Sequence, residues 1–119
     1  MKFSESLKKN RDFREVYQKG RHFSTRLLTM YVTENSSGKN YLGIVVSKKV
    51  GNSVVRHRIK RLIKESYRLH ESGFGIGLNI VVVGRIASKG TTYHDIEKSL
   101  LRLAKLHRIL NSLDEKVNH

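Results

Sequence analysis

The basic side chains between positions 48 and 68 are the residues of this sequence whose chemistry is easiest to assign. This stretch holds eight Lys and Arg and a single acid, Glu65, so its net charge of +7 is half of the +14 carried by the 119-residue chain. A solvated helix face held by ion pairs is the ordinary explanation of a charge run, but one glutamate cannot partner eight cations. Lys and Arg at this density neutralise phosphates and release counterions. The stretch therefore indicates a polyanionic partner.

Aromatic side chains offer a second kind of chemistry, stacking on unpaired bases. Phe13 and Tyr17 lie one turn apart on a predicted helix. Such a pair is more often part of a core than a stacking platform, and both alternatives stay open here. Tyr31 falls on the strand face opposite the alternating apolar residues of its own strand, which favours exposure. A groove between a sheet face and the first helix could present these rings to single-stranded nucleic acid.

The sequence lacks the residue patterns of a self-contained enzyme. There is no Cys, the six His show no metal-ligand spacing, and the ten acids do not cluster. Gly73, Gly75 and Gly77 precede a predicted strand, whereas a dinucleotide fingerprint follows one, so they are interpreted as loop glycines. A lone His in such a chain is usually a surface residue. We expect no catalytic residue and no metal ligand in this chain.

Several elements must position these residues. The pattern predicts a helix over residues 10–19, with Asn10 as its N-cap and Gly20 as its stop. Residues 27–33 and 41–47 read as two strands joined by a polar turn, which predicts an antiparallel hairpin. Residues 79–84 form a continuous apolar strand that we expect to be buried on both faces.

A long helix is predicted from Asn52 or Ser53 to His70. Its apolar and cationic residues separate onto opposite arcs, with Arg58 near the boundary. The apolar arc holds Val55, Ile59, Leu62, Ile63 and Leu69; the cationic arc holds Arg56, Lys60, Arg61, Lys64 and Arg68. A final helix opens at a capping pattern, Thr92 to Asp95, and turns a last apolar set toward the core. That set is Ile96, Leu100, Leu103, Ala104 and Leu110.

These elements predict one domain over residues 1–119, an α+β fold or α/β sandwich with helices on a sheet of three or four strands, and a frayed tail from about residue 111. The long helix links two strands and can serve as a crossover, for which right-handed is the general expectation. No secretory signal or membrane span is visible, so we expect a cytoplasmic protein that does not contact membranes.

Residues 47–65, SKKVGNSVVRHRIKRLIKE, resemble the signature of the bacterial ribonuclease P protein component, SKK-x-GNA-x-x-RNR-x-KR-x-x-RE. Ser53, His57 and Lys64 stand where that signature has Ala, Asn and Arg. The resemblance extends over nearly the whole chain, through an Asp-Phe-x-x-Val-Tyr-x-x-Gly pattern at 12–20, Tyr31, and Arg85-x-Ala-Ser after the last strand.

The resemblance implies a four-stranded mixed sheet in the order αβββαβα, with the basic helix in a left-handed crossover that replaces the right-handed expectation. It also implies a protein that binds a catalytic RNA. That RNA, with Mg²⁺, hydrolyses precursor tRNA at the mature 5′ end, so the catalytic centre lies in the RNA. The protein holds the single-stranded 5′ leader, and no obligate protein partner is expected.

By position, the resemblance assigns two groups of site residues. The group facing the catalytic RNA is Arg56, His57, Arg58, Lys60, Arg61, Lys64 and Arg68. The group lining or bordering the leader cleft is Phe13, Tyr17, Tyr31, Lys48, Lys49, Asn52 and Arg85. Two other functions remain open, a ribosomal or chaperone-like protein that binds structured RNA, and a nuclease that cuts without RNA.

Overall fold

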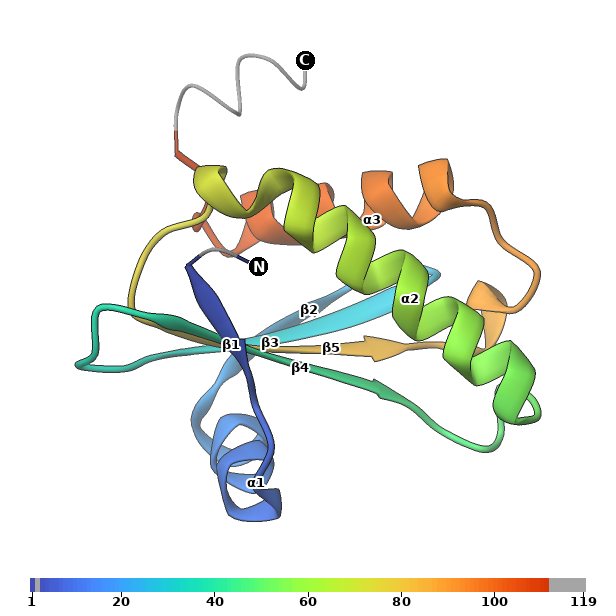
Figure 1. Cartoon of the computed structure of the whole chain (residues 1–119), viewed down its shortest axis with the longest axis horizontal. Coiled ribbons are helices and arrows are strands. Elements are labelled where there is room, and N and C mark those ends of the chain that lie inside the picture. The colour runs from blue at the N-terminus through green and yellow to red at the C-terminus, as the bar shows by residue number, and fades with distance from the viewer. Residues whose placement is uncertain (2, 112–119) are drawn as a thin grey trace.

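A computed structural model describes residue 1 and residues 3–111, so the predicted tail lies outside the described residues except for Asn111. The fold is α+β, with three helices on a five-stranded mixed sheet whose spatial order is β1-β4-β5-β3-β2. Helices α2 and α3 cover one face of the sheet and α1 lies against the other (Figure 1). The elements are β1 (Ser4–Ser6), α1 (Asn10–Lys19), β2 (Arg21–Ser24), β3 (Leu28–Glu34), β4 (Asn40–Val46), α2 (Ser53–His70), β5 (Leu78–Gly84) and α3 (Tyr93–Leu106), with short 3-10 turns at Glu71–Gly73 and Ile86–Ser88.

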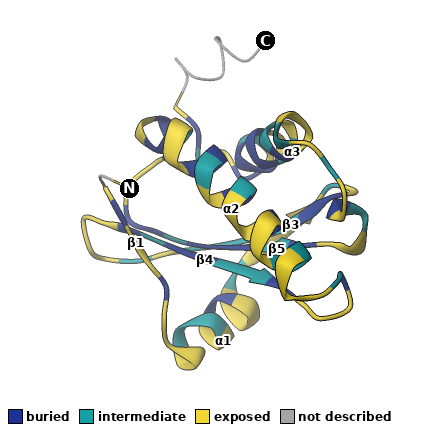
Figure 2. Ribbon diagram, turned by 45° about the vertical axis from the view of Figure 1, so that its right-hand side comes forward, coloured by how far each residue is buried: buried dark blue, intermediate teal, exposed yellow. Residues whose placement is uncertain are grey.

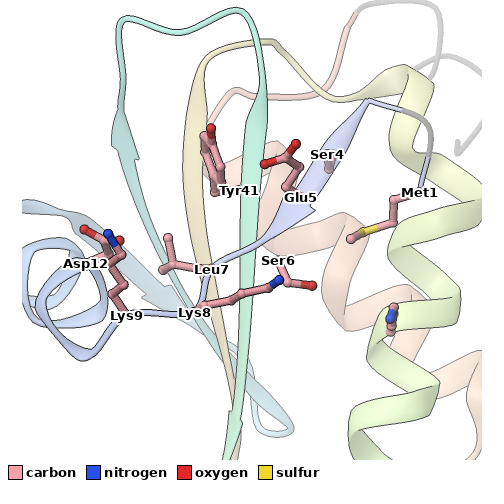
Figure 3. Close-up of a pocket in the computed structure, with 10 residues that line it drawn as sticks. Met1, Ser4, Glu5, Ser6, Leu7, Lys8, Lys9, Asp12 and Tyr41 are labelled. Atoms are coloured by element: carbon pink, nitrogen blue, oxygen red, sulfur yellow. The ribbon is translucent and has the colours of Figure 1, made fainter.

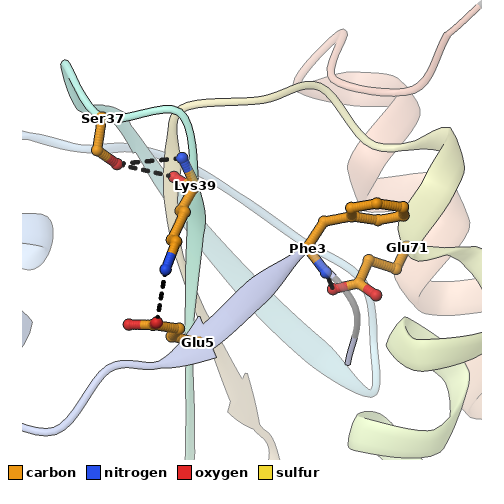
Figure 4. Close-up of polar contacts among 5 residues, drawn as sticks. All are labelled: Phe3, Glu5, Ser37, Lys39 and Glu71. Carbon is orange, nitrogen blue, oxygen red and sulfur yellow. Dashed lines mark hydrogen bonds and ion pairs between the residues drawn. The ribbon is translucent and has the colours of Figure 1, made fainter.

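The prediction of a four-stranded sheet is wrong by one strand, β1. Its three residues, Ser-Glu-Ser, are not β-formers, so no sequence pattern marks them. Strand β1 is held by contacts from distant parts of the chain. It pairs in parallel with β4, and the Ser4 hydroxyl lies 2.6 Å from the Tyr67 hydroxyl on α2. Figure 4 shows two further ties, from the Phe3 amide to Glu71 (3.1 Å) and from Lys39 to Glu5 (2.9 Å).

The antiparallel hairpin predicted for residues 27–33 and 41–47 is also wrong. Strands β3 and β4 do not pair with each other, because β5 lies between them, antiparallel to β3 and parallel to β4. The apolar character of β5 explains this position. Ile80, Val81 and Val82 are fully buried, and only a central strand has neighbours on both edges and cover on both faces. The expectation that this strand is buried on both faces is confirmed.

The core lies on both sides of the sheet. The larger cluster fills the space under α2 and α3, and a smaller one under α1 consists of Leu7, Val16 and Val81 (Figure 2). The inward set predicted for the last helix is confirmed, since Ile96, Leu100, Leu103 and Ala104 are buried on α3, while Leu110 is buried just beyond it. The Thr92 hydroxyl caps α3 by accepting a hydrogen bond of 3.2 Å from the Asp95 amide.

Two details of the helices differ from expectation. Leu69, assigned to the apolar arc of α2, is 55% exposed, and Tyr67 is fully buried instead. At about 100° per residue, Leu69 points roughly 100° away from the centre of the buried arc at Ile59 and Ile63, whereas Tyr67 continues the Ile59, Ile63 row. At α1, Asn10 is the first helical residue rather than the N-cap, and Lys9 precedes it without a side-chain cap.

Helix α2 connects the parallel neighbours β4 and β5 and is therefore a crossover connection, as predicted. Its left-handed sense stays a prediction from the resemblance. Among the described residues, no helix is long and apolar enough to cross a membrane.

Candidate nucleic-acid interface

The outer face of α2 carries a row of basic side chains. Six of the seven residues predicted to face RNA are exposed, and the helix docks on the sheet through Ile59, Ile63 and Tyr67 on its other side. We call this set the α2 ridge; it consists of Arg56, His57, Arg58, Lys60, Arg61, Lys64 and Arg68. The Asn52 side chain caps the helix by accepting a hydrogen bond of 3.0 Å from the Val55 amide.

Two arginines of the α2 ridge also hold neighbouring backbone. Arg58 Nη2 donates to the Thr91 carbonyl at 2.8 Å, which ties α2 to the segment before α3. Arg56 Nε donates to the Gly51 carbonyl at 3.2 Å and the side chain is half-buried. The prediction of Arg56 on the outward arc is therefore wrong in part, because this bond folds the side chain back over the loop that precedes the helix.

Arg68 differs from the rest of the α2 ridge because its charge is partnered. Its Nη2 and Nε atoms lie 2.6 and 3.2 Å from the two Glu65 carboxylate oxygens, one turn away. The hydrogen bond from Arg68 lowers the pKa of Glu65, and the same pair raises the pKa of Arg68. Within the part of the chain that the structure describes, the other basic residues of the α2 ridge make no ion pair. Arg68 is therefore the one member of the α2 ridge whose charge is paired with a described carboxylate.

A second surface lies on the face of the sheet that carries α1. Strand register places His22, Tyr31, Val81 and Gly43 in one row across β2, β3, β5 and β4, and Ser24, Thr29, Val83 and Val45 in the next. Helix α1 packs over the first row, and the second row lies toward the carboxyl ends of β4 and β5. Val83 and Val45 are only half-buried. The second row is therefore an incompletely covered strip of the sheet face beside α1. We call this strip the central cleft, after the leader cleft that the resemblance implies.

Aromatic rings gather beside the central cleft. Tyr17 of α1 meets Tyr31 of β3 edge to face, with ring centroids 4.9 Å apart, and His22 of β2 lies 5.0 Å from Tyr31 on its other side. Tyr17 is 39% exposed, and partial burial raises the pKa of its hydroxyl. The expectation that Tyr31 faces away from Leu28, Met30 and Val32 is confirmed, but its ring is half-buried rather than exposed because it packs beside α1. The sequence analysis missed His22, although its place two residues after the helix stop puts it on the facing strand.

Phe13 has a packing role as well as a place beside the central cleft. Its ring lies directly over Gly43 of β4, where a Cβ atom would overlap the ring carbons. Phe13 is half-buried and packs against the small core cluster under α1. Phe13 is therefore in part a core residue and in part a candidate for stacking on bases, since one side of the ring covers the core and the rest remains accessible.

Cationic side chains border the central cleft at the ends of β4 and β5. Lys49 and Arg85 line one open cavity of about 680 Å³ together with Arg26, which the sequence analysis did not select. Arg85 Nη1 donates to the Thr25 carbonyl at 2.6 Å, fixing the guanidinium against the β2–β3 turn. Lys48 is exposed on the same loop as Lys49 but does not line this cavity.

A further cavity of about 570 Å³ lies where the start of α1 and strand β1 approach α2 (Figure 3). Lys8 and Lys9 line it from the α1 side, and Lys64 of the α2 ridge lines it from the other. Glu5 and Asp12 contribute acids to the same cavity. The α2 ridge and the helix that borders the central cleft are therefore linked by a mixed, mainly basic surface.

The described residues show no group of three or more His, Cys, Asp and Glu that could hold a metal ion. The chemistry that the two surfaces can perform is recognition: the α2 ridge can bind phosphates of a folded polyanion, and the rings beside the central cleft can stack on unpaired bases.

Comparisons with known proteins agree with this geometry. Residues 1–108 match the family model described as Ribonuclease P. The chain is 54% identical to the ribonuclease P protein component of Lachnoclostridium phytofermentans (97% of this chain, 99% of the relative) and 48% identical to that of Alkaliphilus metalliredigens (93% and 100%). Among solved structures it is similar to the RNase P protein of Staphylococcus aureus (TM-score 0.82, 36% identity, 89% of this chain, 97% of that one) and of Thermotoga maritima (0.79, 26%, 89% and 98%).

Proposed function

The chain belongs to the bacterial ribonuclease P protein family, and from this premise we propose how its two surfaces divide the work of that enzyme. As a member, it is the protein subunit of the ribonuclease P ribozyme, an RNA-binding protein of tRNA processing. We propose that the α2 ridge binds the catalytic RNA and that the central cleft holds the 5′ leader of precursor tRNA. The chain would do so in the cytoplasm, where precursor tRNA is made.

The observation that supports two separate binding surfaces is that the basic ridge and the aromatic rings lie on opposite faces of the sheet. The α2 ridge lies on the outer side of a helix that covers one face of the sheet, while Tyr17, Tyr31 and His22 lie on the other face. Folded RNA presents mostly phosphates, whereas a single strand presents unstacked bases. A ridge of arginines fits the first and an aromatic surface with a basic rim fits the second.

Among the cleft residues, the supporting observations are of different strength. Tyr31, Tyr17, Phe13, Lys49 and Arg85 border the central cleft or its rim. Asn52 already caps α2, so we propose that it contributes mainly by fixing the loop that carries Lys49. Lys48 is proposed to act through its charge alone, close to the leader backbone.

We further propose that the Mg²⁺ required for hydrolysis is held by the catalytic RNA and its substrate. The cation would supply charge neutralisation and an activated water at the scissile phosphate. The chain's own contribution is to hold the leader, so that substrate carrying a leader is bound more tightly than mature product. This keeps the chain outside the chemical step.

Reconstitution tests this proposal directly. The purified chain is mixed with a bacterial ribonuclease P RNA at limiting Mg²⁺, and cleavage of precursor tRNA is followed. The expected result is strong stimulation over the RNA alone, and no cleavage by the protein alone. Equal affinity of the holoenzyme for precursor and mature tRNA would instead favour a protein that only binds structured RNA. Cleavage by an RNA-free preparation would favour a nuclease.

A further inference from the structure

The β2–β3 turn joins the rim of the central cleft to a second basic surface on α3. Arg26, at the tip of the turn, lines the cavity that contains Lys49 and Arg85. It also lines a separate cavity of about 800 Å³ between the turn and α3, whose basic residues include Lys98 and Arg102. Arg26 therefore borders both cavities, and the basic residues of the rim continue past the β2–β3 turn to α3.

Helix α3 presents a row of basic residues to this second cavity. His94, Lys98, Arg102 and Lys105 follow one another at intervals of four, four and three, which places them on one stripe of a helix. The stripe lies away from the side of α3 that packs on the sheet through Ile96 and Leu103. We call Arg26 together with Lys98, Arg102 and Lys105 the α3 track.

Among the described residues, no carboxylate neutralises the cations of the α3 track. In the described ranges, none of the four lies within ion-pair distance of a carboxylate. Glu97 also lines the cavity, but its carboxylate is 3.0 Å from His70 Nε2 and 3.1 Å from the Tyr93 hydroxyl, on the side toward α2. Asp95 is the remaining acid of the cavity. An uncompensated row of four cations is costly unless an anion binds it.

The turn that carries Arg26 is rigid. The Thr25 hydroxyl accepts hydrogen bonds from the Leu27 and Leu28 amides at 3.3 and 3.1 Å. Arg85 fixes the same turn twice, through its side chain to the Thr25 carbonyl and through its amide to the Leu27 carbonyl (2.9 Å). Arg26 is exposed at this fixed tip. A ligand that follows the rim thus meets an exposed cation on a turn whose backbone is held by hydrogen bonds.

We propose that the α3 track is a second phosphate-binding site, which takes the backbone of the distal part of the leader after it leaves the central cleft past Arg26. The proposal rests on the function proposed above. Among the described residues that line its cavity, none is a Phe, Tyr or Trp comparable to Tyr31, so the track binds phosphates with little regard for sequence. It extends the length of leader that the protein can recognise.

The test compares two double variants of the reconstituted holoenzyme. Lys98→Gln with Arg102→Gln removes two charges from the α3 track. Lys19→Gln with Lys39→Gln removes the same number from exposed positions elsewhere, where each lysine is paired with a glutamate. Both are measured for Kd and for its salt dependence with precursor tRNA of short leader, precursor tRNA of long leader, and mature tRNA. Thermal unfolding confirms that both variants are folded.

The expected result is a several-fold loss of affinity in the α3-track variant for the long leader only. Its slope of log K against log salt falls by roughly 1.4 there, because each single-strand phosphate contact contributes about 0.7. The control variant stays close to wild type. Equal losses for all three substrates would assign the track to the catalytic RNA, and no loss would leave it without a nucleic-acid role; either result overturns the proposal.

Failure of this proposal and failure of the proposed function are distinguishable in the same data. If wild-type holoenzyme does not prefer the short-leader precursor to mature tRNA, the central cleft does not hold the leader and the function itself is wrong. If that preference is present and only the additional affinity for the long leader is insensitive to the α3-track variant, the proposed function stands and the track is rejected.

Discussion

At the scale of single residues, Tyr31 is the side chain on which the central cleft depends most. It lies between Tyr17 and His22, with centroid distances of 4.9 and 5.0 Å, so its ring organises both neighbours. Substitution Tyr31→Ala should weaken binding of precursor tRNA by about 1–3 kcal/mol, the usual contribution of one stacked base. Binding of mature tRNA should be unchanged. The measurement is the Kd of the holoenzyme for both RNAs.

The matched control at this position is Tyr31→Phe, which retains the ring and removes only the hydroxyl. It should bind precursor tRNA almost as well as wild type. An equal loss in both variants would show that the hydroxyl rather than stacking matters. A loss for mature tRNA of the same size as for precursor would remove Tyr31 from the leader site.

His107 shows a residue-scale property that the sequence analysis did not anticipate. Expected at the surface, it is 2% exposed; Nε2 donates to the Met30 carbonyl at 2.9 Å, and Nδ1 has no partner among the described residues. Burial lowers the pKa of His107, and the nearby Arg21 and His22 lower it further against the opposing effect of the hydrogen bond. The lowered pKa favours the neutral imidazole, and the bond to a carbonyl places a proton on Nε2.

A pH dependence of stability follows from His107. An unfolded histidine has a pKa of about 6.5, so below that pH the unfolded chain takes up a proton that the folded chain resists. The His107 contribution is complete above about pH 6.5 and is lost as the pH falls toward the lower native pKa. Urea unfolding at pH 7 and pH 5 should show a larger loss of stability in wild type than in His107→Gln. Parallel losses would contradict this assignment.

At the scale of elements, the predicted RNA-facing residues of α2 differ in whether a described carboxylate pairs with their charge. Arg61 is exposed and makes no ion pair in the described structure, whereas Arg68 is paired with Glu65. Arg61→Ala should lower the affinity for the catalytic RNA and reduce the salt slope by about 0.9, the value for one phosphate on a duplex. Arg68→Ala should change the affinity for the catalytic RNA and the salt slope much less. Filter binding over a salt series measures both variants.

Glu65→Gln provides the complementary test on the same helix. It removes the acid that partners Arg68 and frees the guanidinium, so affinity for the catalytic RNA should rise and the salt slope should become steeper. The same variant loses only an exposed pair, which contributes little to stability. Unchanged affinity would show that the carboxyl end of α2 does not reach the RNA.

Helix α1 is positioned by the absence of a side chain at Gly43. A Cβ at this position would overlap the ring of Phe13, so Gly43→Ala must displace α1 from the sheet. Such overpacking costs typically 1–3 kcal/mol of folding stability. It should also weaken leader binding, because Tyr17 moves with the helix. Thermal unfolding and the precursor Kd measure the two effects; Gly38→Ala, in open space, is the control.

At the scale of the whole molecule, the sequence was sufficient for the helices and for the family to which the chain belongs. Periodicity predicted α1 and α2 to their ends and the start of α3, although Leu110, assigned to that last helix, lies beyond its end at Leu106. The basic stretch from 48 to 68 with the missing acids indicated a polyanionic partner. The family resemblance then assigned two groups of residues: the α2 ridge lies on one side of the sheet, and Phe13, Tyr17 and Tyr31 of the leader group lie on the other, whereas Asn52 of that group caps α2. These are local or compositional properties, which a chain expresses whatever its tertiary contacts.

What the sequence did not predict depends on contacts between distant segments. Strand β1 exists because β4, Tyr67 and Glu71 hold it, and none of those contacts is visible in Ser-Glu-Ser. Strand β5 pairs with both β3 and β4 and separates them. A short loop between β3 and β4 suggested instead that these two strands pair with each other. Arg26 joins two cavities only after the β2–β3 turn is placed beside α3.

The central claim is that the aromatic face of this chain holds the leader of precursor tRNA while the ribozyme RNA binds elsewhere. The most direct measurement is the ratio of the Kd for mature tRNA to that for precursor tRNA, with the catalytic RNA alone and with the chain added. We predict that the chain raises this ratio well above that of the RNA alone, and that Tyr31→Ala returns it toward the value for the RNA alone. A ratio that the wild-type chain leaves unchanged would contradict the claim.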